Sequence, residues 1–369
     1  MKSRANRVAI VGAGIVGLAH AWAASLRGDA VTVYERDTQA MGASVRNFGL
    51  GLVVGQPQGD LFDLAQQSRG LWLDFLNDAG CWHKTRGSVT VARTDAELQV
   101  LETFQAERGS QYGTEMIGAA AVAAHHAAGL GGLYSRSEIA LDARQVIGAL
   151  SQWLAQKHGV DFQYGVQVNG IALPYLDTSR GKREADQVVV CGGHDFQSLF
   201  PQHFAALGAR RCALQMLRVA NPGIDLGPTL MTGLSTLHYG AFTECAALAA
   251  PLAVLQREVA HNRPALLEHG IHLIVQQVGP SGDLILGDSH AYGESVSPFN
   301  HEEVDALILD LAEGLLQRPL RVLERWQGVY GSGRRAYEVI HPAAGVQAVA
   351  ITAGVGMSIA LALARRNLS

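Results

Sequence analysis

A glycine-rich turn near the N-terminus carries the clearest chemical signal in the sequence. Residues 12–17 read Gly-Ala-Gly-Ile-Val-Gly, follow a short β-branched run at 8–11 and open an alanine-rich stretch that ends at Arg27. The first glycine permits a sharp turn, the second lets the backbone approach a pyrophosphate, and the third allows the helix to pack closely. The free N–H groups at the start of a helix attract the anion. The residues expected to contact a dinucleotide here are Gly12, Gly14, Ile15, Val16 and Gly17.

Glu35 ends the second strand of the same unit, after a strand-like run at 31–34. An acid at this place accepts hydrogen bonds from ribose hydroxyls and disfavours a 2′-phosphate, so NADP is the least expected occupant. Strand, helix, second strand and terminal acid together predict a βαβ dinucleotide site. This unit alone does not separate NAD from FAD.

A second segment with small residues and polar donors follows soon after. Residues 41–49 read Met-Gly-Ala-Ser-Val-Arg-Asn-Phe-Gly, which suits another close approach to a long cofactor. At this point the sequence resembles the family of flavoproteins that contains D-amino-acid oxidase, glycine oxidase and sarcosine oxidase. Segments 141–168, 188–193 and 352–358 are similar to that family too. The resemblance runs from residue 8 to residue 366 and is clearest in the cofactor-binding parts.

The resemblance implies FAD as the cofactor and assigns its contacts. Glu35 and Arg36 would lie at the ribose and adenine, Val168 would meet the adenine through its backbone, and residues 354–357 would lie under the flavin ring. Reduced flavin gathers negative charge at one edge, and a glycine turn entering a helix directs N–H donors at such a charge. The other implied contacts are Ala43, Ser44, Arg46, Asn47, Gly49, Cys191, Gly192, Gly354, Val355, Gly356, Met357 and Ser358.

The attachment of the flavin is also predicted by comparison with the family. Some members bind flavin covalently through a cysteine shortly before the C-terminal segment, but residues 326–331 contain no cysteine. We therefore expect non-covalent FAD. Because a second dinucleotide fingerprint is absent from the sequence, we expect electrons to enter from the substrate and leave to oxygen or to a carrier.

The substrate side departs from the family pattern at one position. Several members hold a substrate carboxylate with the arginine of a Gly-Leu-Arg-Pro segment, whereas residues 328–331 read Gly-Val-Tyr-Gly here. Segments 44–49, 214–217 and 287–292 resemble a branch associated with aminophosphonate breakdown, which implies an amine such as 2-aminoethylphosphonate or its N-methyl derivative. A phosphonate accepts hydrogen bonds from several donors. The candidate substrate-positioning residues are Arg46, His290, Tyr330 and Arg335.

Other chemistries receive less support. The pairs His125–His126 and His269–His272 lack a third ligand at a suitable spacing, so we expect no metal site. His238 is a weaker candidate for the substrate pocket. The serines lack the sequence of a nucleophile elbow, which leaves hydrolase chemistry unsupported.

Composition sets the broad class. The chain has 369 residues, of which 48% are hydrophobic and 17% charged, so it can bury a large core. A formal net charge of −4 excludes nucleic acid as a main partner. The four cysteines form no paired motif, which favours a reducing cytoplasm. Two apolar stretches, 8–26 and 343–364, are interrupted by glycines, so we expect no membrane association, and a homo-oligomer remains open.

The elements that must position these residues predict an α/β protein. We expect a discontinuous Rossmann-type FAD-binding domain from residues 1–80, 140–210 and 321–369. An inserted α+β substrate domain on an antiparallel or mixed sheet would come from 81–139 and 211–320.

The predicted function is that of an FAD-dependent amine oxidase. It would oxidise the C–N bond of a small anionic amine to an imine and form hydrogen peroxide. Two alternatives stay within flavin redox chemistry, namely a glycine, sarcosine or D-amino-acid oxidase and a quinone-linked dehydrogenase. A flavin-binding protein without turnover is the alternative from another class.

Overall fold

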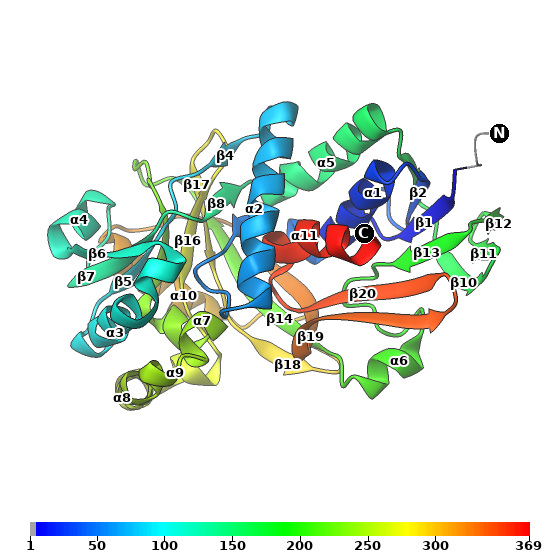
Figure 1. The fold of residues 1–369 in the computed structure, drawn as a ribbon. Coiled ribbons are helices and arrows are strands. Elements are labelled where there is room, and N and C mark those ends of the chain that lie inside the picture. Colours follow the sequence, from blue (N-terminus) through cyan, green and yellow to red (C-terminus); the bar gives the residue numbers. More distant parts are fainter. Residues whose placement is uncertain (1–4) are drawn as a thin grey trace.

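A single mixed sheet of 14 strands runs through the molecule (Figure 1). The computed structural model describes residues 5–369. In sheet order the strands are β6 (Thr114–Gly118), β7 (Gly131–Ser135), β5 (Ser88–Ala92), β15 (Thr229–Thr232), β16 (Ile274–Val278), β17 (Asp283–Gly287), β14 (Arg210–Val219), β19 (Val322–Ala343), β20 (Val346–Ala353), β13 (Gln187–Val190), β1 (Arg7–Val11), β2 (Ala30–Glu35) and β9 (Asp161–Tyr164), with β18 (Ala291–Gly293) paired to β14.

One end of the sheet has the parallel order that the sequence predicts. Strand β1 pairs in parallel with β2 and β13, while β9 and β20 extend the parallel set on either side. The strands β1, β2 and β13 are short. They are rich in valine, as is usual for strands of a parallel sheet that is covered on both faces. The expected βαβ unit is confirmed, with α1 (Ile15–Leu26) between β1 and β2.

The other half of the sheet is mixed. Strands β16 and β17 pair antiparallel, as do β17 and β14, whereas β15 and β5 pair in parallel. The predicted α/β class with a second α+β part on an antiparallel or mixed sheet is confirmed. We propose that the domain limits given above divide the two halves, although their strands belong to one sheet.

The long strand β19 joins the two halves. Its first part pairs with β14, from Val322 to Ser332, and its second part pairs with β20, from Ser332 to Ala343. The irregular register between Ser332 and Tyr337 marks the change of partner. Tyr330 therefore lies at the place where the two halves meet.

The helices cover both halves. Figure 1 shows α1, α2 and α11 side by side against the parallel end. The indole Nε1 of Trp72 in α2 donates to the carbonyl oxygen of Met357 in α11 at 2.7 Å. The helices are α1, α2 (Asp60–Ala79), α3 (Asp95–Tyr112), α4 (Ala119–Ala124), α5 (Ala143–His158), α6 (Pro201–Ala206), α7 (Gly240–Thr243), α8 (Ala249–Asn262), α9 (Pro264–Glu268), α10 (Glu302–Leu316) and α11 (Gly356–Leu368), with 3₁₀ turns η1 (Ala43–Val45), η2 (Gly233–Leu237) and η3 (Ala246–Leu248).

A small antiparallel sheet lies beside the parallel end. Strand β9 ends at Tyr164, and Val168 begins this separate sheet of β10 (Val168–Ala172), β11 (Tyr175–Thr178) and β12 (Gly181–Glu184). Gly165, at a φ of +66°, turns the chain between them. Strand β20 continues to Ala353, directly before the last glycine turn. Within residues 5–369, no helix is long and apolar enough to cross a bilayer.

A buried carboxyl group holds the loop that follows β3 (Leu50–Gly51). Strand β3 belongs to a small sheet with β8 (Ile139–Leu141) and β4 (His83–Lys84). Glu138 has no exposed surface, and its Oε1 accepts the N–H groups of Val53 and Val54 at 3.2 and 2.8 Å. Its Oε2 accepts from the hydroxyl of Ser88 at 2.9 Å. This carboxyl fixes the loop that leads to the central cavity.

Replacing this carboxyl tests its contribution to stability. Glu138→Ala leaves two backbone N–H groups and one hydroxyl without their acceptor, so we expect the free energy of unfolding to fall by about 2–4 kcal/mol. Glu115→Ala, on an exposed strand position, is the control and should change it by less than about 0.5 kcal/mol. Urea unfolding measures both, and equal effects of the two substitutions would contradict the assignment.

Candidate active site

The starts of α1 and α11 face the same cavity. Residues 14–16 line it from the first glycine turn, and residues 354–357 line it from the last. A Cβ on Gly356 would lie 3.5 Å from Cγ2 of Ile15, so the two turns nearly touch. One bound molecule can therefore contact both turns, as the sequence analysis requires of the cofactor.

A second cavity continues from the first toward the end of β2. The residues that line both are Gly14, Ala43, Ser44, Cys191, Gly193 and His194. Glu35, Arg36 and Val168 line only the second cavity. The two cavities together form an elongated space with the predicted adenine end and the predicted flavin end at its extremities.

The first glycine turn has the close contacts that its spacing predicts. Gly12 has a φ of +104°, and a Cβ there would overlap the carbonyl oxygen of Cys191. A Cβ on Gly17 would overlap the carbonyl oxygen of Gly12. Gly17 therefore serves the packing of the turn and does not line either cavity.

The carboxyl of Glu35 is held by the turn itself. Glu35 is 9% exposed, and its Oε2 accepts the N–H of Ala13 at 2.8 Å, while Oε1 accepts the N–H of Asp37 at 3.1 Å. Each oxygen keeps a further lone pair, so the proposed contact with ribose hydroxyls stays compatible with this geometry. Arg36 pairs with Asp195 at 2.9 Å.

The segment around η1 closes over the first turn. The hydroxyl of Ser44 accepts the N–H of Ile15 at 2.9 Å, at the position where a phosphate oxygen would compete for the same donor. Asn47 shapes the segment, because its Nδ2 donates to the carbonyl oxygens of Ala43 and Ser44 and its Oδ1 accepts the N–H of Gly49. Gly49 packs against the carbonyl of Leu141 outside the cavities.

The last glycine turn lies against an aromatic ring. Gly354 has a φ of +69°, and a Cβ there would stand 3.2 Å from Cζ of Tyr330. Helix α11 begins two residues later. The positive end of its dipole is directed at the cavity, which suits an anionic flavin edge. The hydroxyl of Ser358 accepts the N–H of Leu52 at 3.0 Å.

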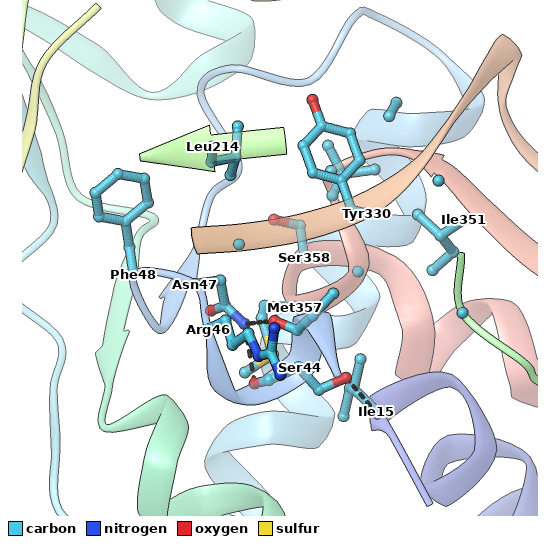
Figure 2. A pocket seen from close by; sticks show the side chains of 18 of the residues that line it. Ile15, Ser44, Arg46, Asn47, Phe48, Leu214, Tyr330, Ile351, Met357 and Ser358 are labelled. Carbon is cyan, nitrogen blue, oxygen red and sulfur yellow. Dashed lines mark hydrogen bonds between the residues drawn. The ribbon is translucent and has the colours of Figure 1, made fainter. Parts of the chain in front are cut away.

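Three of the four candidate substrate residues line the first cavity, here called the flavin-end cavity because it contains the predicted flavin end. These are Arg46, His290 and Tyr330. Figure 2 shows Ser44, Arg46 and Met357 grouped together, with Tyr330 projecting from β19. Arg335 lines a neighbouring cavity instead, and its side chain is 80% exposed, with Glu338 at 4.0 Å. The neighbouring cavity shares Tyr330, His238 and Tyr239 with the first.

The wall of the cavity on the substrate side is formed by a histidine cluster that spacing alone does not reveal. His238, His272 and His290 offer ligand nitrogens that all lie within 4.8 Å of one another. The carboxyl of Asp288 lies 3.6 Å from Nε2 of His272 and 3.9 Å from Nε2 of His290. All four residues line the flavin-end cavity.

Burial sets the protonation of this cluster. Loss of hydration holds the pKa of the buried His272 well below its usual range, and the neighbouring imidazoles lower it further. Burial raises the pKa of Asp288 to about 6 and raises the pKa of the Tyr330 phenol. The cavity wall therefore includes the neutral imidazole of His272, the neutral phenol of Tyr330 and the cation of Arg46.

The sequence missed part of this arrangement. His272 was paired with His269, but the structure brings it together with His238 and His290, and only the backbone carbonyl of His269 approaches, as acceptor for the N–H of His290. His194, which lines both cavities, follows directly after the Gly192–Gly193 turn that was expected to bind cofactor. The position of His194 shortly after β13, a strand of the parallel set, is the sequence feature that could have identified it as a cavity residue.

The fold and the site together define a dinucleotide-dependent oxidoreductase. The parallel sheet carries a glycine turn at its first helix, and an elongated cavity runs from this turn to the start of a second helix. The sequence matches the family DAO, described as FAD dependent oxidoreductase, over residues 7–367. The chain belongs to this family, and its cofactor is FAD.

Several enzymes of known structure share this fold. Glycine oxidase from Geobacillus kaustophilus superposes with a TM-score of 0.77 at 18% identity, covering 98% of this chain and 94% of its own. L-proline dehydrogenase from P. horikoshii gives 0.76 at 15% identity, with 98% and 91% covered. Iminodiacetate oxidase from Chelativorans sp. BNC1 gives 0.73 at 15% identity, with 98% and 94% covered. No curated protein sequence gives a significant match.

The glycine at the last turn allows a direct test of the cofactor site. Gly354→Ala places a methyl group against Tyr330 in a left-handed conformation that costs about 1–2 kcal/mol. We expect FAD to dissociate about tenfold more readily, measured by flavin fluorescence during dilution. The control Gly148→Ala, at an exposed position inside α5 with open space around it, should leave FAD affinity unchanged, and tight FAD binding by both variants would contradict the assignment.

Proposed function

We propose that this protein is an FAD-dependent amine oxidase for a small anionic amine of the 2-aminoethylphosphonate type, free or N-methylated. In the overall reaction the C–N bond of the amine is oxidised to an imine and oxygen is reduced to hydrogen peroxide. Water then hydrolyses the imine to a carbonyl compound and an amine. The observation that carries the proposal is the group of polar side chains at the flavin end of the cavity.

The residues present fit the cofactor. Bound FAD supplies the acceptor for two electrons and a hydride equivalent. Residues 14–16 and Ser44 would hold its phosphates, Glu35 and Arg36 its ribose and adenine end, and residues 354–357 its ring. The glycine backbone at 354 leaves room that a side chain would fill.

The chain's own residues would bind and orient the amine. Apolar side chains, among them Phe48, Leu214 and Met216, also line the cavity. Such surroundings favour the neutral form of an amine, because burial penalises its charge. The carboxyl of Asp288 can accept a hydrogen bond from the amine nitrogen. No separate base is then required for an amine that binds unprotonated.

The anionic group is the specific part of the proposal. Tyr330 stands where several relatives carry an arginine, so a carboxylate would lose its bidentate partner. A phosphonate has three oxygens and suits dispersed donors. Arg46 supplies a cation at the wall of this cavity, whereas the hydroxyl of Tyr330 points away from Arg46 and interacts with Cys212 and Tyr292 (Figure 2). This arrangement, together with the resemblance in segments 44–49, 214–217 and 287–292, supports a phosphonate.

Two alternatives are supported by single observations. Likeness to glycine oxidase supports a glycine, sarcosine or D-amino-acid oxidase. Likeness to L-proline dehydrogenase supports transfer of electrons to a carrier such as a quinone. A flavin-binding protein without turnover is supported by the replacement of arginine by Tyr330.

Anaerobic mixing with candidate amines separates these functions. We expect flavin absorbance to bleach fastest with 2-aminoethylphosphonate or its N-methyl derivative. Faster bleaching by glycine, sarcosine or D-alanine would replace the proposal with the amino-acid oxidase. Slow oxygen use with fast reduction of artificial acceptors would indicate the dehydrogenase, and failure of every amine would indicate a protein without turnover.

Arg46 is the cation to test against the anionic group. Arg46→Met removes a charge-assisted hydrogen bond of about 1.5–3 kcal/mol, so we expect KM to rise about 10- to 100-fold. Arg335→Met, at the exposed position in the neighbouring cavity, should change KM less than about threefold. FAD content is measured for both variants, because loss of flavin from Arg46→Met would assign this side chain to the cofactor.

Non-covalent attachment is predicted as well. Cys191 lines the cavity, but burial raises the pKa of its thiol, and its Sγ lies 4.0 Å from Nδ1 of His20 in the core. A thiol that stays protonated is a poor nucleophile. Acid precipitation should release all flavin into the supernatant, and yellow colour in the pellet would show a covalent bond.

A further inference from the structure

We propose that His238, His272, His290 and Asp288 bind one divalent transition-metal ion, of which Zn²⁺ has the best-matched chemistry. The site lies on the substrate side of the flavin-end cavity. It goes beyond the proposed amine oxidation and does not rest on it.

The four residues come from separate segments that the mixed half of the sheet brings together. His238 follows η2, His272 precedes β16, and Asp288 and His290 lie between β17 and β18. Pairing of β15 with β16 and of β16 with β17 sets these segments beside one another. The cluster is thus part of the sheet architecture.

Two atoms of the cluster are buried without partners. Within residues 5–369, Nε2 of His272 and Oδ1 of Asp288 have no hydrogen-bond partner, and the two side chains are 4% and 8% exposed. These atoms face each other at 3.6 Å. Buried polar atoms are satisfied in most native proteins, so such a pair indicates a missing ligand. A cation between a lone pair of nitrogen and a carboxylate oxygen satisfies both.

The imidazoles are oriented as metal ligands are. Nδ1 of His290 donates to the carbonyl oxygen of Gly270 at 2.8 Å, which leaves Nε2 as a lone pair directed toward Asp288. Nδ1 of His272 lies 3.2 Å from the hydroxyl of Ser235. Metal-binding histidines almost always use their other ring nitrogen in this way.

The distances require a small contraction. Tetrahedral zinc with bonds of about 2.1 Å places its ligand atoms about 3.4 Å apart. The ligand nitrogens of the three histidines lie within 4.8 Å of one another, and the oxygens of Asp288 lie 3.6 Å from Nε2 of His272 and 3.9 Å from Nε2 of His290. His238 lies at the open side of the cluster, so rotation of its side chain can bring the third nitrogen inward. Three nitrogens and one carboxylate oxygen match the ligand types of zinc.

Metal content of the wild-type holoprotein is the first test. The protein is purified with FAD, treated with a chelator, titrated with Zn²⁺ and then passed through a desalting column. Elemental analysis should find about one zinc ion per chain, and replacement by Co²⁺ should give the visible absorption of a low-coordinate site. Absence of retained zinc, or a cobalt spectrum like that of the hydrated ion, would overturn the proposal.

Substitutions then locate the ion. His272→Gln and His290→Gln should each weaken zinc binding by more than about 100-fold, and Ser235→Ala should weaken it by about tenfold through the orientation of His272. His269→Gln, which keeps the backbone that contacts His290, is the matched control and should bind zinc as the wild type does. Retention of zinc by both ligand variants with FAD content intact would overturn the assignment. If these variants fail to fold, the wild-type cobalt spectrum decides alone. Zinc is measured without any amine, so the result is independent of the outcome for amine oxidation.

Discussion

The close approach of the starts of α1 and α11 is the constraint on which the site depends. Two glycine turns, separated by nearly the whole chain, come so close that a Cβ on Gly356 would lie 3.5 Å from Cγ2 of Ile15. The contact between Trp72 and Met357 holds the second turn from the side of α2. Because both helix N-termini then face one cavity, two positive dipole ends act on the same bound molecule. A shift of either helix would move its N-terminal turn away from this shared cavity.

The long strand β19 connects the cofactor part of the site to the substrate part. Its first part belongs to the mixed half of the sheet and its second part pairs with β20, which leads into the last glycine turn. Tyr330 consequently packs its ring against Gly354 while facing residues from the mixed half. The same connection places the histidine cluster and residues 354–357 around one cavity. The substrate part and the cofactor part are thus joined through one strand that belongs to both.

The sequence predicted what is local and missed what depends on distant pairing. The first βαβ unit follows from short periodic patterns with glycine punctuation, and the structure has it. The glycine turn at 12–17 could be predicted because each glycine answers a local steric need. The histidine cluster could not, because His238, His272 and His290 meet only through the pairing of three strands. Arg335 was placed near Tyr330 by sequence distance, but the bulge in β19 directs it to the neighbouring cavity.

Unsatisfied polar atoms in the cavity show where the free energy of ligand binding comes from. A folded protein that buries Nε2 of His272 and Oδ1 of Asp288 without partners gives up about 1–3 kcal/mol for each. A ligand that supplies the missing contacts recovers this free energy, whereas one that offers only apolar surface does not. The cavity therefore binds apolar molecules less well, because they leave these polar atoms without a partner. Arg46 extends the same preference to anions, because its charge lies in a cavity lined largely by apolar side chains. Selection by unmet polar groups requires that these groups stay rigid, and the hydrogen bonds of His272 to Ser235 and of His290 to Gly270 provide that rigidity.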